Sequence, residues 1–135
     1  MRGPTHRASI VVLAAALVPW CAASAHHSVL GFDGSHETTI KGRVVQLKWQ
    51  FPHVRFAVLV ARDGGDETWS VESEAPQVLR TLGWQPDAVR VGDVVTVHGA
   101  RAKDGSMALR CAVVELGAGR KLECFAAARA AGGGS

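Results

Sequence analysis

The strongest local pattern in this sequence is a strict alternation of apolar residues between positions 54 and 60. The apolar positions are Val54, Phe56, Val58 and Val60. The turn sequence Asp-Gly-Gly-Asp follows at residues 63–66, and Trp69 and Val71 resume the alternation. Side chains of a β-strand point to opposite faces in turn, and glycine-containing pairs are typical of tight hairpin turns. The pattern therefore predicts a β-hairpin with one buried face.

The rest of the chain extends this hairpin into a mainly β fold. A strand from Thr39 precedes it, strands at 94–98 and 107–116 follow it, and residues 75–82 show helical spacing. Three strands, one helix, two strands and a short return are the order of an OB-like barrel. We expect a small OB-like antiparallel barrel of five to six strands over residues 39–125, with one short helix between strands three and four. An irregular barrel or roll of the same strands fits nearly as well.

Two cysteines lie near the end of the predicted barrel. The Gly-Ala pair at 117–118 suits a two-residue hairpin turn, and that turn places Cys111 directly opposite Cys124. In the same strand, Leu109, Cys111 and Val113 are expected to share one face. A cross-strand disulfide between Cys111 and Cys124 is therefore feasible, and the alternative is a pair of small buried apolar side chains.

The two ends of the chain differ from the predicted barrel. Two arginines precede an unbroken apolar run at residues 10–18, and Ala-Ser-Ala at 23–25 suits a signal peptidase. The apolar run is too short to span a bilayer, which takes about 20 residues. We therefore expect residues 1–25 to be a signal peptide, and the mature protein to be periplasmic or secreted with no stable membrane anchor. The Ala/Gly-rich residues 126–135 are expected to form a disordered tail.

Cleavage at this site begins the mature chain at His26, the first residue of an extended arm expected over residues 26–38. The α-amine and the imidazole of His26 can then chelate one transition-metal ion, and nitrogen ligands favour copper(II). A third ligand can come from His27, His53 or His98. We choose His53, because it follows a strand-breaking proline at a strand edge. The alternative is that a histidine pair at a chain terminus has no binding role.

A second class of function needs no metal. The rings of Trp49, Trp69 and Trp84, with Glu72 as a polar contact, can line one open face of the barrel and bind a periplasmic protein or a small molecule. The alternative is that the three rings fill a small core. The sequence contains no nucleophile elbow, phosphate loop or dinucleotide fingerprint, so it does not point to an enzyme.

The charge balance bears on the class of partner. The chain has 15 Lys and Arg against 12 Asp and Glu, and two of the arginines belong to the expected signal peptide, so the mature net charge is only +1. Nucleic-acid binding depends on Lys and Arg that neutralise phosphates. The near-neutral balance therefore predicts a partner other than nucleic acid.

Several short motifs are spread over residues 25–122. They are His26-His27-Ser28, Trp49 with Pro52-His53, Gly83-Trp84 and Lys103-Asp104-Gly105-Ser106. With these motifs the chain resembles a family of small exported bacterial proteins classed only as a domain of unknown function. The resemblance implies an exported, β-rich domain and supplies no activity. This chain has Phe51 where the family usually has Asn before Pro-His, and Glu74-Ala75 where a small helix-capping residue is usual.

Overall fold

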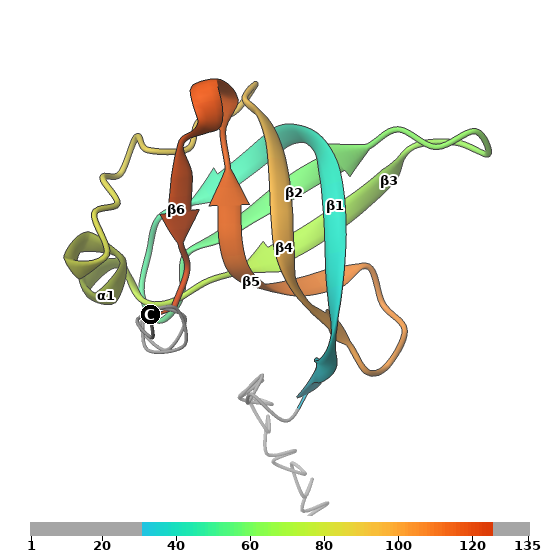
Figure 1. Ribbon diagram of the computed structural model, residues 1–135, viewed down its shortest axis with the longest axis horizontal. Helices are drawn as coiled ribbons and strands as arrows, with labels where there is room; N and C mark the ends of the chain where they lie inside the picture. The colour runs from blue at the N-terminus through green and yellow to red at the C-terminus, as the bar shows by residue number, and fades with distance from the viewer. Residues whose placement is uncertain (1–30, 126–135) are drawn as a thin grey trace, which may run out of the picture.

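The computed structural model describes residues 31–125 (Figure 1). Its elements are β1 (Phe32–Lys48), β2 (Arg55–Val60), β3 (Glu67–Glu72), α1 (Pro76–Thr81), β4 (Val94–Ala102), β5 (Ala108–Glu115), a 3₁₀ turn (Gly117–Gly119) and β6 (Lys121–Glu123). The hairpin expected from the apolar alternation is formed by β2 and β3, and the helix lies between the third and fourth strands as predicted. No helix in this part of the chain is long and apolar enough to cross a membrane.

The strands form one sheet that closes on itself. Their order is β3-β2-β1-β4-β5-β6 with antiparallel neighbours, and β3 also pairs in parallel with the first half of β5. The parallel pairing joins Ser70 to Ala108 and Glu72 to Arg110. Five strands therefore make a ring, and β6 lies against the second half of β5 (Figure 1). This strand order, with its helix after β3, confirms the predicted OB-like fold.

β1 pairs on both sides because it bends. Its first part pairs with β4 and its later part with β2, and the register slips between Val44 and Gln46 and again earlier in the strand. Such slips are β-bulges, which bend a strand and increase its twist. The strand begins at Phe32, so residues 32–38 of the expected arm belong to β1.

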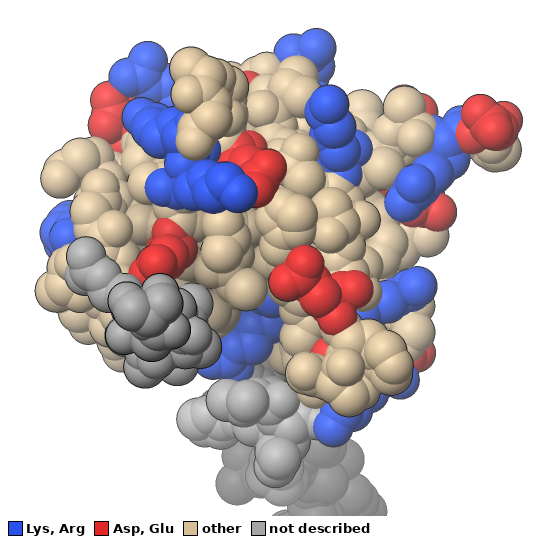
Figure 2. Space-filling view, viewed as in Figure 1, with Lys and Arg blue, Asp and Glu red and all other residues tan. Residues whose placement is uncertain are grey.

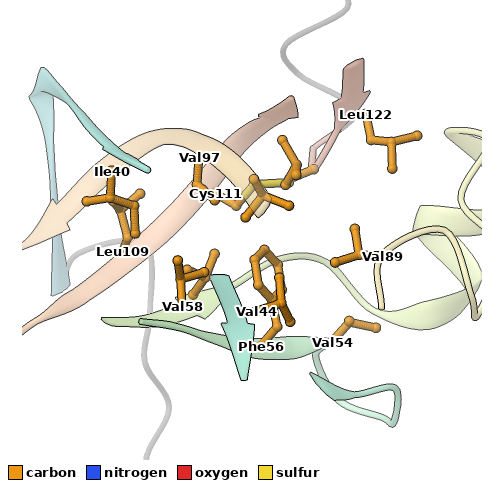
Figure 3. Packing of buried hydrophobic residues seen from close by; sticks show 14 of the residues in the cluster. Ile40, Val44, Val54, Phe56, Val58, Val89, Val97, Leu109, Cys111 and Leu122 are labelled. Carbon is orange, nitrogen blue, oxygen red and sulfur yellow. A yellow bond between two sulfur atoms is a disulfide. The ribbon is translucent and has the colours of Figure 1, made fainter. Parts of the chain in front are cut away.

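The core lies inside the ring, where the inward-facing residues of the strands meet (Figure 3). Its fully buried aliphatic residues are Val44, Val54, Val58, Val71, Leu79, Val89, Val95, Val97, Leu109 and Val114. Leu79 comes from α1, and Trp84, which follows that helix, is the largest side chain that is fully buried. The helix therefore supplies apolar cover for the barrel, which is how a small sheet of this kind gains enough buried area.

The end of α1 returns the chain to the core. The N–H of Gly83 donates to the carbonyl of Arg80 at 3.1 Å, and the N–H of Trp84 donates to that of Leu79 at 3.0 Å. These are the paired bonds of a Schellman motif, and the φ of 90° at Gly83 suits glycine. Trp84 is thereby turned inward, and its Nε1 donates to the carbonyl of Glu123 at 2.7 Å. This bond ties the end of the helix to β6.

The turn between β5 and β6 is longer than predicted. It has three residues, Gly117–Gly119, and this shifts the register of β6 by one. Cys124 therefore lies opposite Ala112, to whose carbonyl its N–H donates at 2.8 Å, and not directly opposite Cys111. The expectation of a two-residue turn is wrong, because the left-handed residues are the second and third of the turn and not the first.

A bulge in β5 compensates for this shift. The register against β4 slips at Ala112, so β5 carries one extra residue there. The slip turns Val114 inward, while Val113, which was expected on the buried face, is half-exposed. Cys111 stays on the buried face and forms a disulfide with Cys124, their Cα atoms 5.7 Å apart. The expected pair of cysteines is therefore bonded, although in a different register.

Candidate functional site

The loop between β1 and β2 holds His53 against the end of β3. Val54, the next residue, is fully buried, and its N–H donates to the carbonyl of Glu74 at 3.0 Å. The carbonyl of Val54 accepts from the N–H and the hydroxyl of Ser73, at 3.0 and 3.2 Å. Pro52, the preceding residue, follows a cis peptide bond. The backbone that carries His53 is therefore fixed to the segment that joins β3 to α1.

Glu72 lies at the centre of the side chains around His53. It is the last residue of β3 and pairs with Arg55 of β2 across the hairpin. Arg55 contacts Oε2 of Glu72 through Nε at 3.0 Å and Nη2 at 2.8 Å, and Nδ1 of His53 lies 3.1 Å from Oε1. The side chain of Glu72 is only 9% exposed, and a carboxylate this buried is costly unless it is paired. We call these three residues the His53 cluster.

The other nitrogen of His53 is open. The His53 side chain is 34% exposed, and no hydrogen bond or ion pair to its Nε2 is seen among residues 31–125. His98, the other candidate in this range, is enclosed: its Nδ1 lies 3.0 Å from Oγ1 of Thr39, and its buried Nε2 lies 3.5 Å from Glu115. A hydrogen bond from Lys121 lowers the pKa of Glu115, so this carboxylate stays charged beside His98. Of the two, His53 has the accessible ring nitrogen.

A pocket of about 320 Å³ opens beside the His53 cluster. Glu72, Arg55 and Ser70 form one side of it, and the β4–β5 loop around Lys103 forms another. Gly31, the first described residue, also lines the pocket, and its carbonyl accepts from the N–H of Lys103 at 3.0 Å. The amino-terminal segment therefore joins the barrel at the pocket that Glu72 lines.

A larger hollow of about 820 Å³ lies between the α1–β4 loop and the β5–β6 turn. Its charged side chains are already engaged. Arg90 contacts Asp87 at 2.6 Å, and Asp93 accepts from the N–H of Arg90 at 2.8 Å. Arg120 donates to the carbonyl of Ala88. None of the residues that line this hollow is a histidine or a cysteine, so it offers less chemistry than the pocket beside His53.

The predicted metal site lies only partly within the described residues. His26 and His27 are outside them, so the structure does not place these two ligands. Within residues 31–125, no group of three or more His, Cys, Asp or Glu side chains is arranged to hold a metal ion. The described part of the chain therefore offers His53 as a single ligand and does not by itself support a copper site.

The three tryptophans lie in or against the core. Trp69 and Trp84 are buried, and Trp49 packs against Trp84 with ring centroids 6.5 Å apart. Nε1 of Trp69 donates to Glu67 at 2.9 Å, and this bond lowers the pKa of Glu67. Trp69 and Trp84 therefore fill the core, half-buried Trp49 packs against it, and Glu72 contacts His53 and Arg55.

The sequence of this domain can be compared with known families. A model of a family of unknown function, DUF6152, matches residues 13–110. The chain belongs to the DUF6152 family. This agrees with the resemblance to an uncharacterised family that the sequence motifs carried. No curated protein matches the chain.

Two solved structures are similar to this DUF6152 chain in fold. Both are crystal structures of Rim1, the mitochondrial single-stranded DNA-binding protein of S. cerevisiae. One is 18% identical with a TM-score of 0.46, and the other is 17% identical with a TM-score of 0.44. Each alignment covers 60% of this chain and 92% of the Rim1 chain. At this identity the likeness concerns the fold alone.

The expectation that nucleic acid is not a partner is contradicted, because both matched structures are of single-stranded DNA-binding proteins. The expectation came from net charge, which sums over the whole chain and does not describe one face. Basic and acidic side chains are interspersed on the face seen in Figure 2. Lys48 and Arg55 line one hollow of about 230 Å³, and Arg55 is paired with Glu72. Net charge therefore does not exclude nucleic acid from this DUF6152 domain, and the likeness in fold does not assign it.

Sequence reasoning selected both residues in this DUF6152 chain, but it assigned Glu72 to a tryptophan-lined face and not to His53. Glu72 and Glu74 share one side of a strand, which suggests two solvated carboxylates. A tight turn centred on the two glycines at 64–65 would also place Glu74, not Glu72, opposite Arg55. In the structure Val60 lies opposite Glu67, so the hairpin is centred between Asp63 and Gly64, and this register places Glu72 opposite Arg55. The residue types therefore indicate that a glutamate can pair with Arg55 and His53, but they do not give the strand register that places Glu72 there.

Proposed function

We propose that this DUF6152 domain is an exported protein that binds a transition metal, most naturally copper, through a processed amino terminus at His26 together with His53. The observation that carries the proposal is the half-exposed ring of His53, whose Nε2 has no partner among residues 31–125 and whose neighbour Glu72 lines the same pocket as Gly31. The buried Cys111–Cys124 disulfide supports the export, because disulfides persist in oxidising compartments.

The proposed site requires the amino-terminal residue of the processed chain to reach His53. His26 precedes Gly31 by five residues, and an extended chain advances at most about 3.5 Å per residue, which gives a reach of about 17 Å. Gly31 and Glu72 line the same pocket, and Glu72 contacts His53. We therefore propose that the α-amine of His26 binds the ion beside Glu72 and His53.

The chemistry of these groups favours a metal such as copper. An α-amine has a pKa of about 7.7–8.0 and an imidazole about 6.5, so a metal ion displaces their protons readily near neutral pH. The amine and the imidazole of His26 close a chelate ring, and Nε2 of His53 adds a third nitrogen. Copper(II) has the highest affinity of the divalent first-row metals for such nitrogen ligands.

The direct test of the terminal chelate is a copper(II) titration followed by EPR. One protein begins at His26 with a free α-amine, and its partner has the same sequence with that α-amine acetylated. We expect one tight copper site with nitrogen hyperfine structure in the first protein, weakened at least tenfold in the second, because acetylation removes the α-amine as a ligand. Equal affinity in the two proteins would contradict the proposal.

The contribution of the barrel is tested by His53→Ala and His36→Ala, both in the protein that begins at His26. The His36 side chain is 85% exposed, and its partner Asp33 is 3.6 Å away and also exposed. We expect His53→Ala to weaken copper binding and to reduce the number of coordinated nitrogens seen by EPR. His36→Ala is the matched control and should leave both unchanged.

A further inference from the structure

We infer that Glu72, clamped by Arg55, is a positioning residue for a metal site: it fixes the proton of His53 on Nδ1 and keeps Nε2 free to bind the ion. The inference rests on the proposed function and adds a defined role for the barrel in it. A metal-binding histidine usually has a carboxylate or carbonyl at its other ring nitrogen, which sets the tautomer and the orientation of the ring.

Glu72 is placed unusually for a residue on the outer side of a strand. Its neighbours in β3, Trp69 and Val71, point into the core, so its own side chain points outward, yet it is only 9% exposed. Arg55 holds Oε2 through two nitrogens, and this leaves Oε1 to face His53. An arginine can only donate, so it also fixes which oxygen of the carboxylate is available.

The contact with Glu72 decides where the proton of neutral His53 lies. A carboxylate oxygen is an acceptor only, and Nδ1 lies 3.1 Å from it. A lone pair on Nδ1 is repelled by this negatively charged oxygen at 3.1 Å, whereas an N–H there is attracted to it. The neutral ring therefore carries its proton on Nδ1 and its lone pair on Nε2, where a metal binds.

The backbone around His53 holds this residue beside Glu72. Val54 is fully buried, and both its N–H and its carbonyl bond to the β3–α1 segment that follows Glu72. His53 and Glu72 are therefore fixed to each other by the backbone as well as by their side chains. His36 has no such support, since it lies on an exposed part of β1 beside an exposed carboxylate.

The substitution Glu72→Gln tests the role of the carboxylate with almost no change of shape. Arg55 needs an acceptor, so the amide oxygen of the new side chain will turn toward Arg55 and its NH₂ toward His53. Nδ1 of His53 must then accept a hydrogen bond, which moves the proton to Nε2 and blocks the metal-binding nitrogen. We expect copper affinity to fall about 10- to 100-fold in the protein that begins at His26.

The tautomer is read directly by ¹⁵N NMR of the histidine side chains in metal-free protein, at a pH where imidazole is neutral. We expect the proton of His53 on Nδ1 in the wild type and on Nε2 in Glu72→Gln. A wild-type His53 with its proton on Nε2, or with an even mixture, would overturn the inference without any variant. Glu67→Gln is the matched control, because it removes a carboxylate from the same strand that does not contact His53.

The copper titration separates this inference from the proposed function. If the tautomer changes as expected but Glu72→Gln binds copper as tightly as the wild type, the positioning role is wrong and the proposed function stands. If the wild type binds no copper at all, the proposed function is wrong, and the role of Glu72 in a metal site is wrong with it. The expected tautomers, together with the loss of copper affinity in Glu72→Gln, support both the proposed function and the positioning role of Glu72.

Discussion

Two glycines in the strands occupy positions where no side chain fits. A Cβ at Gly99 would lie 2.1 Å from the carbonyl oxygen of Arg110, and one at Gly42 would lie 2.2 Å from that of Leu59. Glycine within a strand often marks a close approach of another backbone. Because the obstructing atoms belong to the backbone of neighbouring strands, they cannot move aside as a flexible side chain would. The closed ring therefore depends on both residues.

We predict that Gly99→Ala lowers the free energy of unfolding by about 1–3 kcal/mol or more, the range typical of overpacking. Gly64→Ala is the control, because nothing lies within 4 Å of a Cβ at that position, and it should change stability by less than about 0.5 kcal/mol. Urea unfolding of the two variants measures the difference. Equal stability would show that the strands separate there without cost.

A single carboxyl group also gives a pH-dependent prediction. Hydrogen bonds from Trp69 and Arg62 hold the pKa of Glu67 below its ordinary value of 4.5. Because the pKa is lower in the folded state, this group stabilises the fold above about pH 4.5 and loses that contribution as the pH falls through the lower folded pKa. In Trp69→Phe, which keeps a ring but removes the donor, an NMR titration should show the pKa of Glu67 rising toward 4.5. An unchanged titration curve would contradict the role of Trp69.

Among the secondary-structure elements, β6 is the shortest strand and the one most dependent on cross-links. It has three residues, Lys121–Glu123, and pairs only with β5 among the strands. Two further ties hold its end: the disulfide from Cys124 to Cys111, and the bond from Trp84 to the carbonyl of Glu123. β6 therefore stays in place through contacts at its end as well as through its own ladder.

Removal of the disulfide should loosen β6 before the rest of the barrel. The two cysteines are 13 residues apart, and closing a loop of this length in the unfolded chain corresponds to about 3 kcal/mol. We expect the double variant Cys111→Ala and Cys124→Ala to lose about 2–4 kcal/mol in urea unfolding. The rate of amide hydrogen exchange should increase more at Lys121–Glu123 than in the other strands. Equal protection of β5 and β6 would contradict this expectation.

The elements differ in how well the sequence predicts them. The β2–β3 hairpin and the end of α1 at Gly83 follow from local patterns, namely apolar alternation and a glycine suited to positive φ. The extra residue at Ala112 and the early start of β1 do not, because each depends on the register against β4, which is distant in sequence. The local sequence determines whether a segment forms a helix or a strand. Pairing with distant strands determines its register and which of its residues face the core.

In the whole molecule, closure of the ring brings together the parts of the candidate site. The parallel pairing of β3 with β5 carries the β4–β5 loop to the side of Glu72, and the ladder between β1 and β4 carries Gly31 to that same loop. His53 was predictable from its place after Pro52. Its contact with Glu72 was not, and neither was the pocket that Glu72 shares with Gly31, because that pocket exists only once the ring has closed.

Copper binding between His26 and His53 is tested most directly by adding one equivalent of copper(II) to ¹⁵N-labelled protein that begins at His26. The paramagnetic ion broadens the NMR signals of nearby residues. We predict that the amide signals of Gly31, Val54 and Ser73 disappear, while those of the β2–β3 turn at 63–66 remain sharp. Broadening centred on His36 or His98 instead, with Val54 and Ser73 unaffected, would contradict the proposed site.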